Sequence, residues 1–201
     1  LLESGPTPLH LVTLSGVSYD IITRRMKEAN ISPLPNSPKK NRRYPVKDCR
    51  KLMQELFSNK NKTDKKVQCF YNFKGGVGKT SLSYQVATHL ALLGYKILLI
   101  DTDPQANLTN CFGLVPNLNA PTLYDALIKG IPINSAIMNI YEGLDFIQSN
   151  ISLTRLEAEL IHQPRKEELL KDLIDSVKEN YDFVMIDANP NINQINRNVD
   201  R

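Results

Sequence analysis

The fold is decided by the stretch Lys66-Val-Gln-Cys-Phe-Tyr-Asn-Phe-Lys-Gly-Gly-Val-Gly-Lys-Thr80, which is followed by Ser81. Apolar and aromatic residues with the pattern of a short strand run into a glycine-rich turn, and a helical pattern follows from Ser81 to Leu93. A strand, a glycine-rich loop and a helix in this order are typical of a loop that binds phosphate. Glycines let successive N–H groups point at one anion, and the new helix adds its positive N-terminal end.

Within this loop the residue types predict specific contacts. We expect Lys79 to reach the terminal phosphates of a nucleotide and the Thr80 hydroxyl to bind Mg²⁺. The alternative is a glycine-rich turn that binds nothing. The predicted nucleotide-binding residues are Lys74, Gly75, Gly76, Val77, Gly78, Lys79, Thr80 and Ser81.

The loop departs from the plain pattern G-x-x-x-x-G-K-[ST], because Phe73 stands where the first glycine belongs. The run from Lys74 to Thr80, K-G-G-V-G-K-T, resembles the deviant Walker A motif of the ParA/MinD family of ATPases. Two later segments resemble the same family, in its order: Asp101-Thr-Asp-Pro-Gln-Ala-Asn107, and the Walker B-like strand Phe183-Val-Met-Ile-Asp187. The presence of three such motifs argues against the alternative of a glycine-rich turn that binds nothing.

The resemblance implies ATP/ADP and Mg²⁺ as cofactors and assigns roles to the residues that match. Asp103 would orient or deprotonate the attacking water, and Lys74 would cross to the ATP of a partner subunit in a homodimer. The residues expected to act in catalysis are Lys74, Lys79 and Asp103. Those expected to hold the metal are Thr80 directly, and Asp187 and Asp101 through its water shell.

Composition sets the outer limits. The chain has 201 residues, 41% of them hydrophobic, which suffices for one large or two small domains. It contains no apolar run of the roughly 18 residues that a membrane span needs, and no secretory signal opens it. The odd, scattered cysteines Cys49, Cys69 and Cys111 predict neither disulfides nor a zinc site. We therefore expect a cytoplasmic, nucleoid-associated protein without a membrane partner.

Charge divides the chain unevenly. Residues 1–65 carry 13 Lys/Arg against 6 Asp/Glu, whereas residues 66–201 carry 12 against 15. We predict an N-terminal DNA-binding domain over residues 1–57, a polar linker over 58–65, and an ATPase domain over 66–201 that is incomplete at its C-terminal end. A basic front end of this kind favours a polyanionic partner.

The front end predicts two helices separated by a basic loop. Ser18 is a candidate N-cap for a helix over 19–29, prolines interrupt residues 31–41, and a second helix spans 47–57. This order resembles the winged helix-turn-helix of MerR-type DNA-binding domains; the alternative is a solvated basic face. The predicted DNA-binding residues are Ser18, Tyr19, Thr23, Arg24, Arg25, Lys27, Lys39, Lys40, Arg42 and Arg43.

The rest of the chain alternates strands and helices. Helices are predicted over 121–128, with Thr122 as its cap and Gly130 at its end, over 153–161 and over 165–180. Strands are predicted over 96–100 and 181–187, and a strand followed by a loop over 143–150. Residues 1–12 offer no clear element, except that a short helical pattern starts at Leu11 and runs to Leu14. The fold class is therefore α/β: a parallel P-loop NTPase sheet flanked by helices and preceded by a small, mainly helical winged domain.

Both ends of the sequence depart from the family's pattern. No initiator Met opens the chain, and the Asn-rich segment from Ala188 to Arg201 replaces the family's Thr-Pro-Pro-like segment and long helix. We expect either a piece of a longer product or a truncated protein; the family's adenine-binding and C-terminal DNA-binding residues would lie beyond this sequence.

The leading hypothesis is a ParA-type plasmid or chromosome partition ATPase. The resemblance implies ATP-dependent dimerisation, nonspecific DNA binding by the ATP-bound dimer, operator binding with operon autorepression through the N-terminal domain, and a centromere-binding partner of the ParB type. One alternative is a transcriptional regulator that nucleotide switches without turnover. Another is a MinD-like positioning ATPase on membranes.

Overall fold

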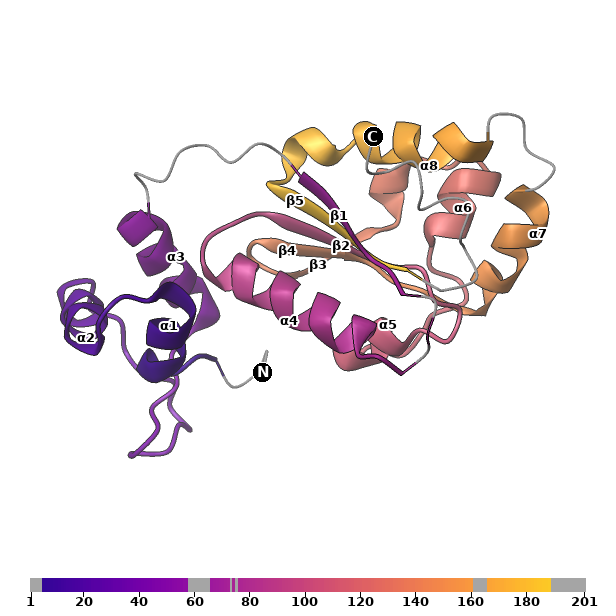
Figure 1. Ribbon diagram of the computed structural model, residues 1–201. Coiled ribbons are helices and arrows are strands. Elements are labelled where there is room, and N and C mark those ends of the chain that lie inside the picture. Colours follow the sequence, from indigo (N-terminus) through magenta and orange to yellow (C-terminus); the bar gives the residue numbers. More distant parts are fainter. Residues whose placement is uncertain (1–4, 58–65, 73, 75, 161–165, 189–201) are drawn as a thin grey trace. The chain divides into compact units, whose positions relative to one another are not determined.

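The computed structural model describes residues 5–57, 66–72, 74, 76–160 and 166–188 (Figure 1). It divides into two compact units, one of Leu1–Lys62 with His89–Tyr95 and the other of Thr63–Thr88 with Lys96–Arg201. The predicted linker, 58–65, lies outside the described residues.

The second unit is built on a five-stranded sheet with the strand order β1-β5-β2-β4-β3 (Figure 1). The strands are β1 (Lys66–Phe70), β2 (Ile97–Asp101), β3 (Ile137–Tyr141), β4 (Leu144–Ile147) and β5 (Phe183–Asp187). The pairs β1–β5, β5–β2 and β2–β4 are parallel. Every residue of β2 is buried, as expected for a strand covered on both faces.

Helices pack on both faces of this sheet (Figure 1). On one face, Leu98 and Ile100 of β2 join a core with α6 (Leu123–Ile128), α7 (Leu156–Leu160) and α8 (Lys166–Asp175). On the other face, Phe146 packs against Phe112, which follows α5 (Asn107–Cys111) and touches Tyr84 of α4 (Lys79–Leu92). Short 3₁₀ turns, η1 (Ile133–Ser135), η2 (Ile151–Arg155) and η3 (Lys178–Asn180), connect these elements.

The sheet is not wholly parallel, so that prediction was wrong in one strand. β3 pairs antiparallel with β4 through the two-residue connection Glu142-Gly143, where Gly143 has φ 95°. β3 was not predicted because it is a half-buried edge strand whose apolar residues do not alternate cleanly.

Two of the predicted helices have different bounds in the structure. The helix predicted over 165–180 ends at Asp175; Val177, with φ −122° and a buried side chain, separates it from η3. The helix predicted over 153–161 is divided between η2 and α7, and position 161 lies outside the described residues. The capped helix at Thr122 is confirmed: the Asp125 carboxylate accepts from the Thr122 N–H and hydroxyl at 2.8 and 3.0 Å.

The first unit is helical. Its helices are α1 (Pro8–Ser15), α2 (Tyr19–Glu28) and α3 (Val46–Phe57), and their buried core is Leu11, Ile22, Met26, Cys49, Leu52 and Met53, with Leu92. α2 and α3 were predicted. α1 begins before the predicted Leu11, because Thr7 caps it and Pro8 occupies its first turn.

Two further features shape this unit. The buried Arg50 guanidinium donates to the carbonyl oxygens of Gly94 and Tyr95 at 2.8 and 3.0 Å. Between α2 and α3 the chain forms turns and no strand over the described residues 29–45. Instead, the Leu34 N–H donates to the Arg43 carbonyl at 2.8 Å, which closes the basic loop at its base.

Among the residues that the structure describes, no helix combines the length and the apolar character needed to cross a bilayer.

Candidate phosphate-binding site

The site lies at the carboxyl ends of three neighbouring strands of the sheet. Phe70 of β1 is the register partner of Asp187 of β5, which is in turn the partner of Asp101 of β2. The glycine-rich loop follows β1 directly. Parallel strands thus bring the loop and two carboxylates to the edge where ligands of open α/β sheets bind.

The loop has the backbone that its glycines predict. Gly76 and Gly78 have φ 71° and 82°, in the left-handed region that favours glycine. The Lys74 N–H donates to the Asn72 side-chain oxygen at 3.0 Å, and Lys74 is exposed. Position 73 and the predicted ligand Gly75 lie outside the described residues.

The start of α4 brings the loop's cation and hydroxyl together. Lys79 and Thr80, its first two residues, are half-buried, whereas Val77 and Ser81 are exposed. The buried Ser83 hydroxyl donates to the Thr80 carbonyl at 3.0 Å. The first N–H groups of a helix have no partner within it, so this end suits an anion.

Asp187 carries a buried oxygen without a partner. Its side chain is 2% exposed, and its Oδ1 forms no hydrogen bond with any described residue. Burial raises the pKa of this carboxyl; the nearby Thr80 and Ser83 side chains and the charge of Lys79 act against that rise. A buried, unpaired carboxylate oxygen is costly unless a cation or its water shell meets it. The donor set around Asp187 therefore fits Mg²⁺.

Asp101 is held differently. Its Oδ1 accepts from the Asp103 N–H at 3.1 Å, and its Oδ2 accepts from the N–H and hydroxyl of Thr109 at 2.9 and 2.8 Å. Burial nevertheless raises the pKa of this carboxyl to about 7. Both oxygens already have protein donors, so the geometry suits a framework role at least as well as the predicted metal role.

Asp103 lies at the rim of the site. It is half-buried, and its Oδ1 accepts from the Gln105 N–H at 2.9 Å. Its charge contributes to the raised pKa of Asp187, so the two carboxyls are near each other. Sequence reasoning missed Thr109 and Ser149, which frame the Asp103 segment. Ser149 is a polar residue just after a buried strand, which hints at the site but not at its contact, and Thr109, inside α5, carried no signal.

No group of three or more His, Cys, Asp or Glu residues that could hold a metal occurs in the described part of the chain. A Mg²⁺ site of the phosphate-loop kind does not require such a group, because a hydroxyl, phosphate oxygens and waters supply most of its ligands.

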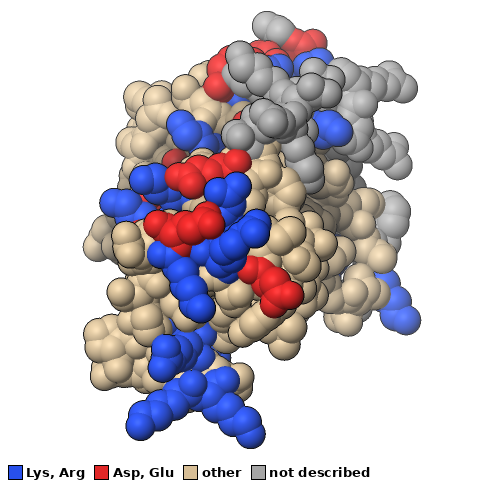
Figure 2. Space-filling view, turned by 90° about the vertical axis from the view of Figure 1, so that its left-hand side faces the viewer, with Lys and Arg blue, Asp and Glu red and all other residues tan. Residues whose placement is uncertain are grey.

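A basic groove of about 640 Å³ lies in the first unit. Its described lining contains no acidic residue and combines one face of α2 with the basic loop; the polar and charged members are Thr7, Tyr19, Thr23, Lys27, Lys39, Lys40, Asn41, Arg42, Arg43 and Tyr44. Tyr19, Thr23 and Lys27 are four residues apart and share one side of the helix. Figure 2 shows Lys and Arg side chains without acidic neighbours at the bottom of the view.

The structure separates the predicted DNA-binding residues into two groups. Seven of the ten line the groove, but Ser18, Arg24 and Arg25 do not. Arg24 and Arg25 each pair with Glu28, at 3.8 and 3.3 Å. Ser18 precedes α2 as its N-cap without a side-chain capping bond.

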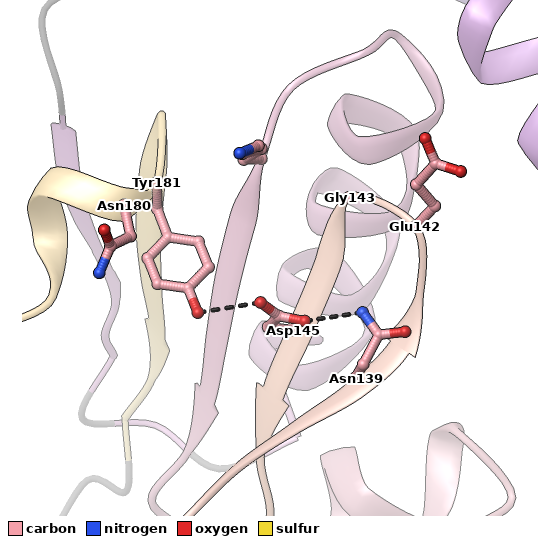
Figure 3. Close-up of a pocket in the computed structure, with 7 residues that line it drawn as sticks. Asn139, Glu142, Gly143, Asp145, Asn180 and Tyr181 are labelled. Carbon is pink, nitrogen blue, oxygen red and sulfur yellow. Dashed lines mark hydrogen bonds between the residues drawn. The ribbon is translucent and has the colours of Figure 1, made fainter. Parts of the chain in front are cut away.

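A second pocket, of about 460 Å³, lies at the opposite edge of the sheet, where β2, β4 and β5 begin (Figure 3). There the two oxygens of Asp145 accept from Asn139 Nδ2 and the Tyr181 hydroxyl, at 2.7 and 2.9 Å. The central carboxylate is therefore already paired, which favours a structural role.

The loop, the sheet order and the converging carboxylates define a P-loop NTPase domain. A family model described as an AAA domain matches residues 65–199, so the chain belongs to that family. Among curated relatives, the cell division protein PomZ of Myxococcus xanthus is 39% identical over 132 residues, 65% of this chain and 41% of that protein. The chromosome partitioning protein ParA of Caulobacter vibrioides is 35% identical over 136 residues, 66% of this chain and 51% of that one. These relatives place the chain among the ParA/MinD P-loop ATPases, and it spans about half their length.

Solved structures agree with this assignment. Cobyrinic acid a,c-diamide synthase from Mycobacterium smegmatis, with bound ATP analogue and magnesium, is 29% identical with a TM-score of 0.63, over 68% of this chain and 54% of that one. A plasmid partition protein from Borrelia burgdorferi is 31% identical with a TM-score of 0.61, over 68% and 61%.

Proposed function

We propose that this chain carries the catalytic core of a ParA-type partition ATPase that binds ATP with Mg²⁺ and hydrolyses it. One observation supports this most strongly: the buried Oδ1 of Asp187, which has no hydrogen-bond partner among the described residues, lies in a site that also holds Lys79, Thr80 and the left-handed Gly76 and Gly78. Relatives named for chromosome partitioning support the biological role.

The residues divide the work of phosphoryl transfer. The loop N–H groups and Lys79 neutralise phosphate charge, and the Thr80 hydroxyl and the Asp187 carboxylate would hold Mg²⁺, the latter through water. When bound, the metal neutralises charge on the phosphate oxygens. Asp103, the rim carboxylate, orients the attacking water or takes its proton.

Lys74 completes the site only in a dimer. It is exposed and precedes the helix start by five residues, so its ammonium group is available to a nucleotide on a second subunit. A cation supplied in trans stabilises transition-state charge, which links turnover to dimerisation.

The N-terminal unit supports DNA as a further partner. The groove, whose described lining is basic and contains no acidic residue, has the charge that duplex phosphates require. We propose that the groove binds operator DNA and mediates autorepression, that the ATP-bound dimer also binds nucleoid DNA nonspecifically, and that a centromere-binding protein of the ParB type stimulates hydrolysis.

Dimerisation and turnover measured together test this proposal. In full-length protein, Lys74→Ala should still bind ATP but should lose ATP-dependent dimerisation, as followed by light scattering, and phosphate release. Tight ATP binding and operator binding without turnover in the wild type would instead favour the nucleotide-switched regulator. Binding of intact protein to liposomes would favour a MinD-like role.

A further inference from the structure

Four residues at the edge of the site form a closed ring of hydrogen bonds. The Asp103 N–H donates to Asp101 Oδ1 at 3.1 Å, and the Ser149 hydroxyl donates to the Asp103 carbonyl at 2.5 Å. The Ser149 N–H donates to Thr109 Oγ1 at 3.0 Å, and that hydroxyl donates to Asp101 Oδ2 at 2.8 Å. The peptide groups on both sides of Asp103 are therefore fixed.

The ring draws on three separate segments. Asp101 ends β2, Thr109 lies in α5, and Ser149 follows β4 by two residues. These three are fully buried, and only Asp103 reaches partial exposure. Nearby, Ala106 has φ 53°, a left-handed conformation unusual for a residue other than glycine. The surrounding contacts therefore hold this loop in an unfavourable backbone conformation. Hydrogen bonds to buried groups therefore hold the main chain of Asp103, whereas the residue itself is partly exposed.

We infer that Thr109 and Ser149 are positioning residues for Asp103 in the hydrolysis of ATP. The inference rests on the proposed function, in which Asp103 orients the attacking water. Neither hydroxyl reaches the nucleotide in this account. Each acts by fixing the main chain from which the Asp103 carboxylate projects, and misplacement of a reacting group by about 1 Å costs as much as ~100-fold in rate.

Ser149→Ala in full-length protein removes the bond to the Asp103 carbonyl and leaves the Ser149 N–H in place. We expect kcat for ATP to fall about tenfold while KM stays within about twofold, because the interaction serves the transition state. Ser135→Ala is the matched control: its hydroxyl also donates to a main-chain carbonyl, that of Pro132 at 2.7 Å, away from the site.

The pair Thr109→Val and Thr109→Ser separates positioning from packing. Val keeps the shape and loses the hydroxyl; Ser keeps the hydroxyl and loses a methyl group. Positioning predicts low kcat for Val and nearly normal kcat for Ser, whereas a packing role predicts the reverse. This pair also decides the question if Ser149→Ala proves poorly folded by its melting temperature.

The variant Asp103→Asn, measured in parallel, distinguishes a failure of the positioning inference from a failure of the proposed role of Asp103. If Asp103→Asn abolishes turnover but Ser149→Ala and Thr109→Val keep the kcat of the Ser135→Ala control, the positioning role is wrong and the role of Asp103 stands. If Asp103→Asn itself turns over normally, the assignment of Asp103 and this inference are both wrong.

Discussion

Asp101 and Asp187 are direct register partners at the ends of β2 and β5, and both carboxyls are buried. Their surroundings nevertheless differ. Each oxygen of Asp101 accepts from a protein donor, whereas Oδ1 of Asp187 accepts from none of the described residues. Asp101 therefore stabilises the loop that follows β2, whereas Asp187 can still bind a ligand through Oδ1.

This difference predicts opposite effects on stability and function at Asp187. Asp187→Asn removes a buried charge whose oxygen has no partner, so the metal-free protein should gain about 1 kcal/mol in free energy of unfolding. The same variant should lose Mg²⁺-dependent stabilisation by ATP. Thermal melts with and without Mg·ATP measure both effects, and a lower melting temperature for the ligand-free variant would contradict the assignment.

Asp101 predicts a pH dependence of stability. Its pKa in the folded chain is about 7, above the ordinary value of 3.8, so between these values the folded state binds more protons than the unfolded state. The free energy of unfolding contributed by this group should therefore fall as the pH rises from about 4 to about 7 and level off above that. Urea melts at several pH values check this, with Asp101→Asn as the reference. A wild-type profile parallel to that of Asp101→Asn would show that Asp101 does not titrate in this window.

The groove predicts which basic residues bind DNA. Lys27→Ala and Lys40→Ala should each weaken DNA binding several-fold at moderate salt and reduce the salt slope by about 1, because each removes a phosphate contact. Arg24→Ala is the matched control: it removes the same charge from the same helix, but Arg24 pairs with Glu28 outside the groove. Fluorescence anisotropy on duplex DNA distinguishes them. Equal losses for all three variants would point to a diffuse charge effect.

The capping box of α6 predicts a loss of stability without a loss of activity. The Asp125 carboxylate accepts from Thr122 and from Lys129 Nζ, the latter at 2.7 Å. Asp125→Ala should therefore cost about 1 kcal/mol in free energy of unfolding and leave kcat unchanged. Chemical denaturation together with a turnover assay checks this; a tenfold fall in kcat at full folding would mean that α6 influences the site.

The site was largely predictable because its motifs are local. Lys79, Thr80 and the glycines follow each other in sequence, and parallel strands carry Asp101 and Asp187 to the same edge. The helices α2 and α3 were predicted from their apolar spacing. These features depend on residues close together in the chain or on a rule about strand ends.

What the sequence did not reveal depends on distant partners. Ser149 meets Asp103 only after β4 takes its place beside β2, and nothing in the local sequence marks that contact. β3 escaped prediction because an edge strand is defined by its neighbour more than by its own pattern. Sequence alone also grouped Arg24 and Arg25 with Lys27, but only Lys27 lies on the side of α2 that meets the distant basic loop and lines the groove.

Phosphate release from Mg·ATP by the full-length protein tests the central claim most directly. The account predicts slow, Mg²⁺-dependent turnover that is lost in Lys79→Ala, since this residue neutralises the phosphates, while the variant keeps its fold by circular dichroism. Turnover by Lys79→Ala at the wild-type rate, or no ATP binding by the wild type at millimolar Mg²⁺, would contradict it.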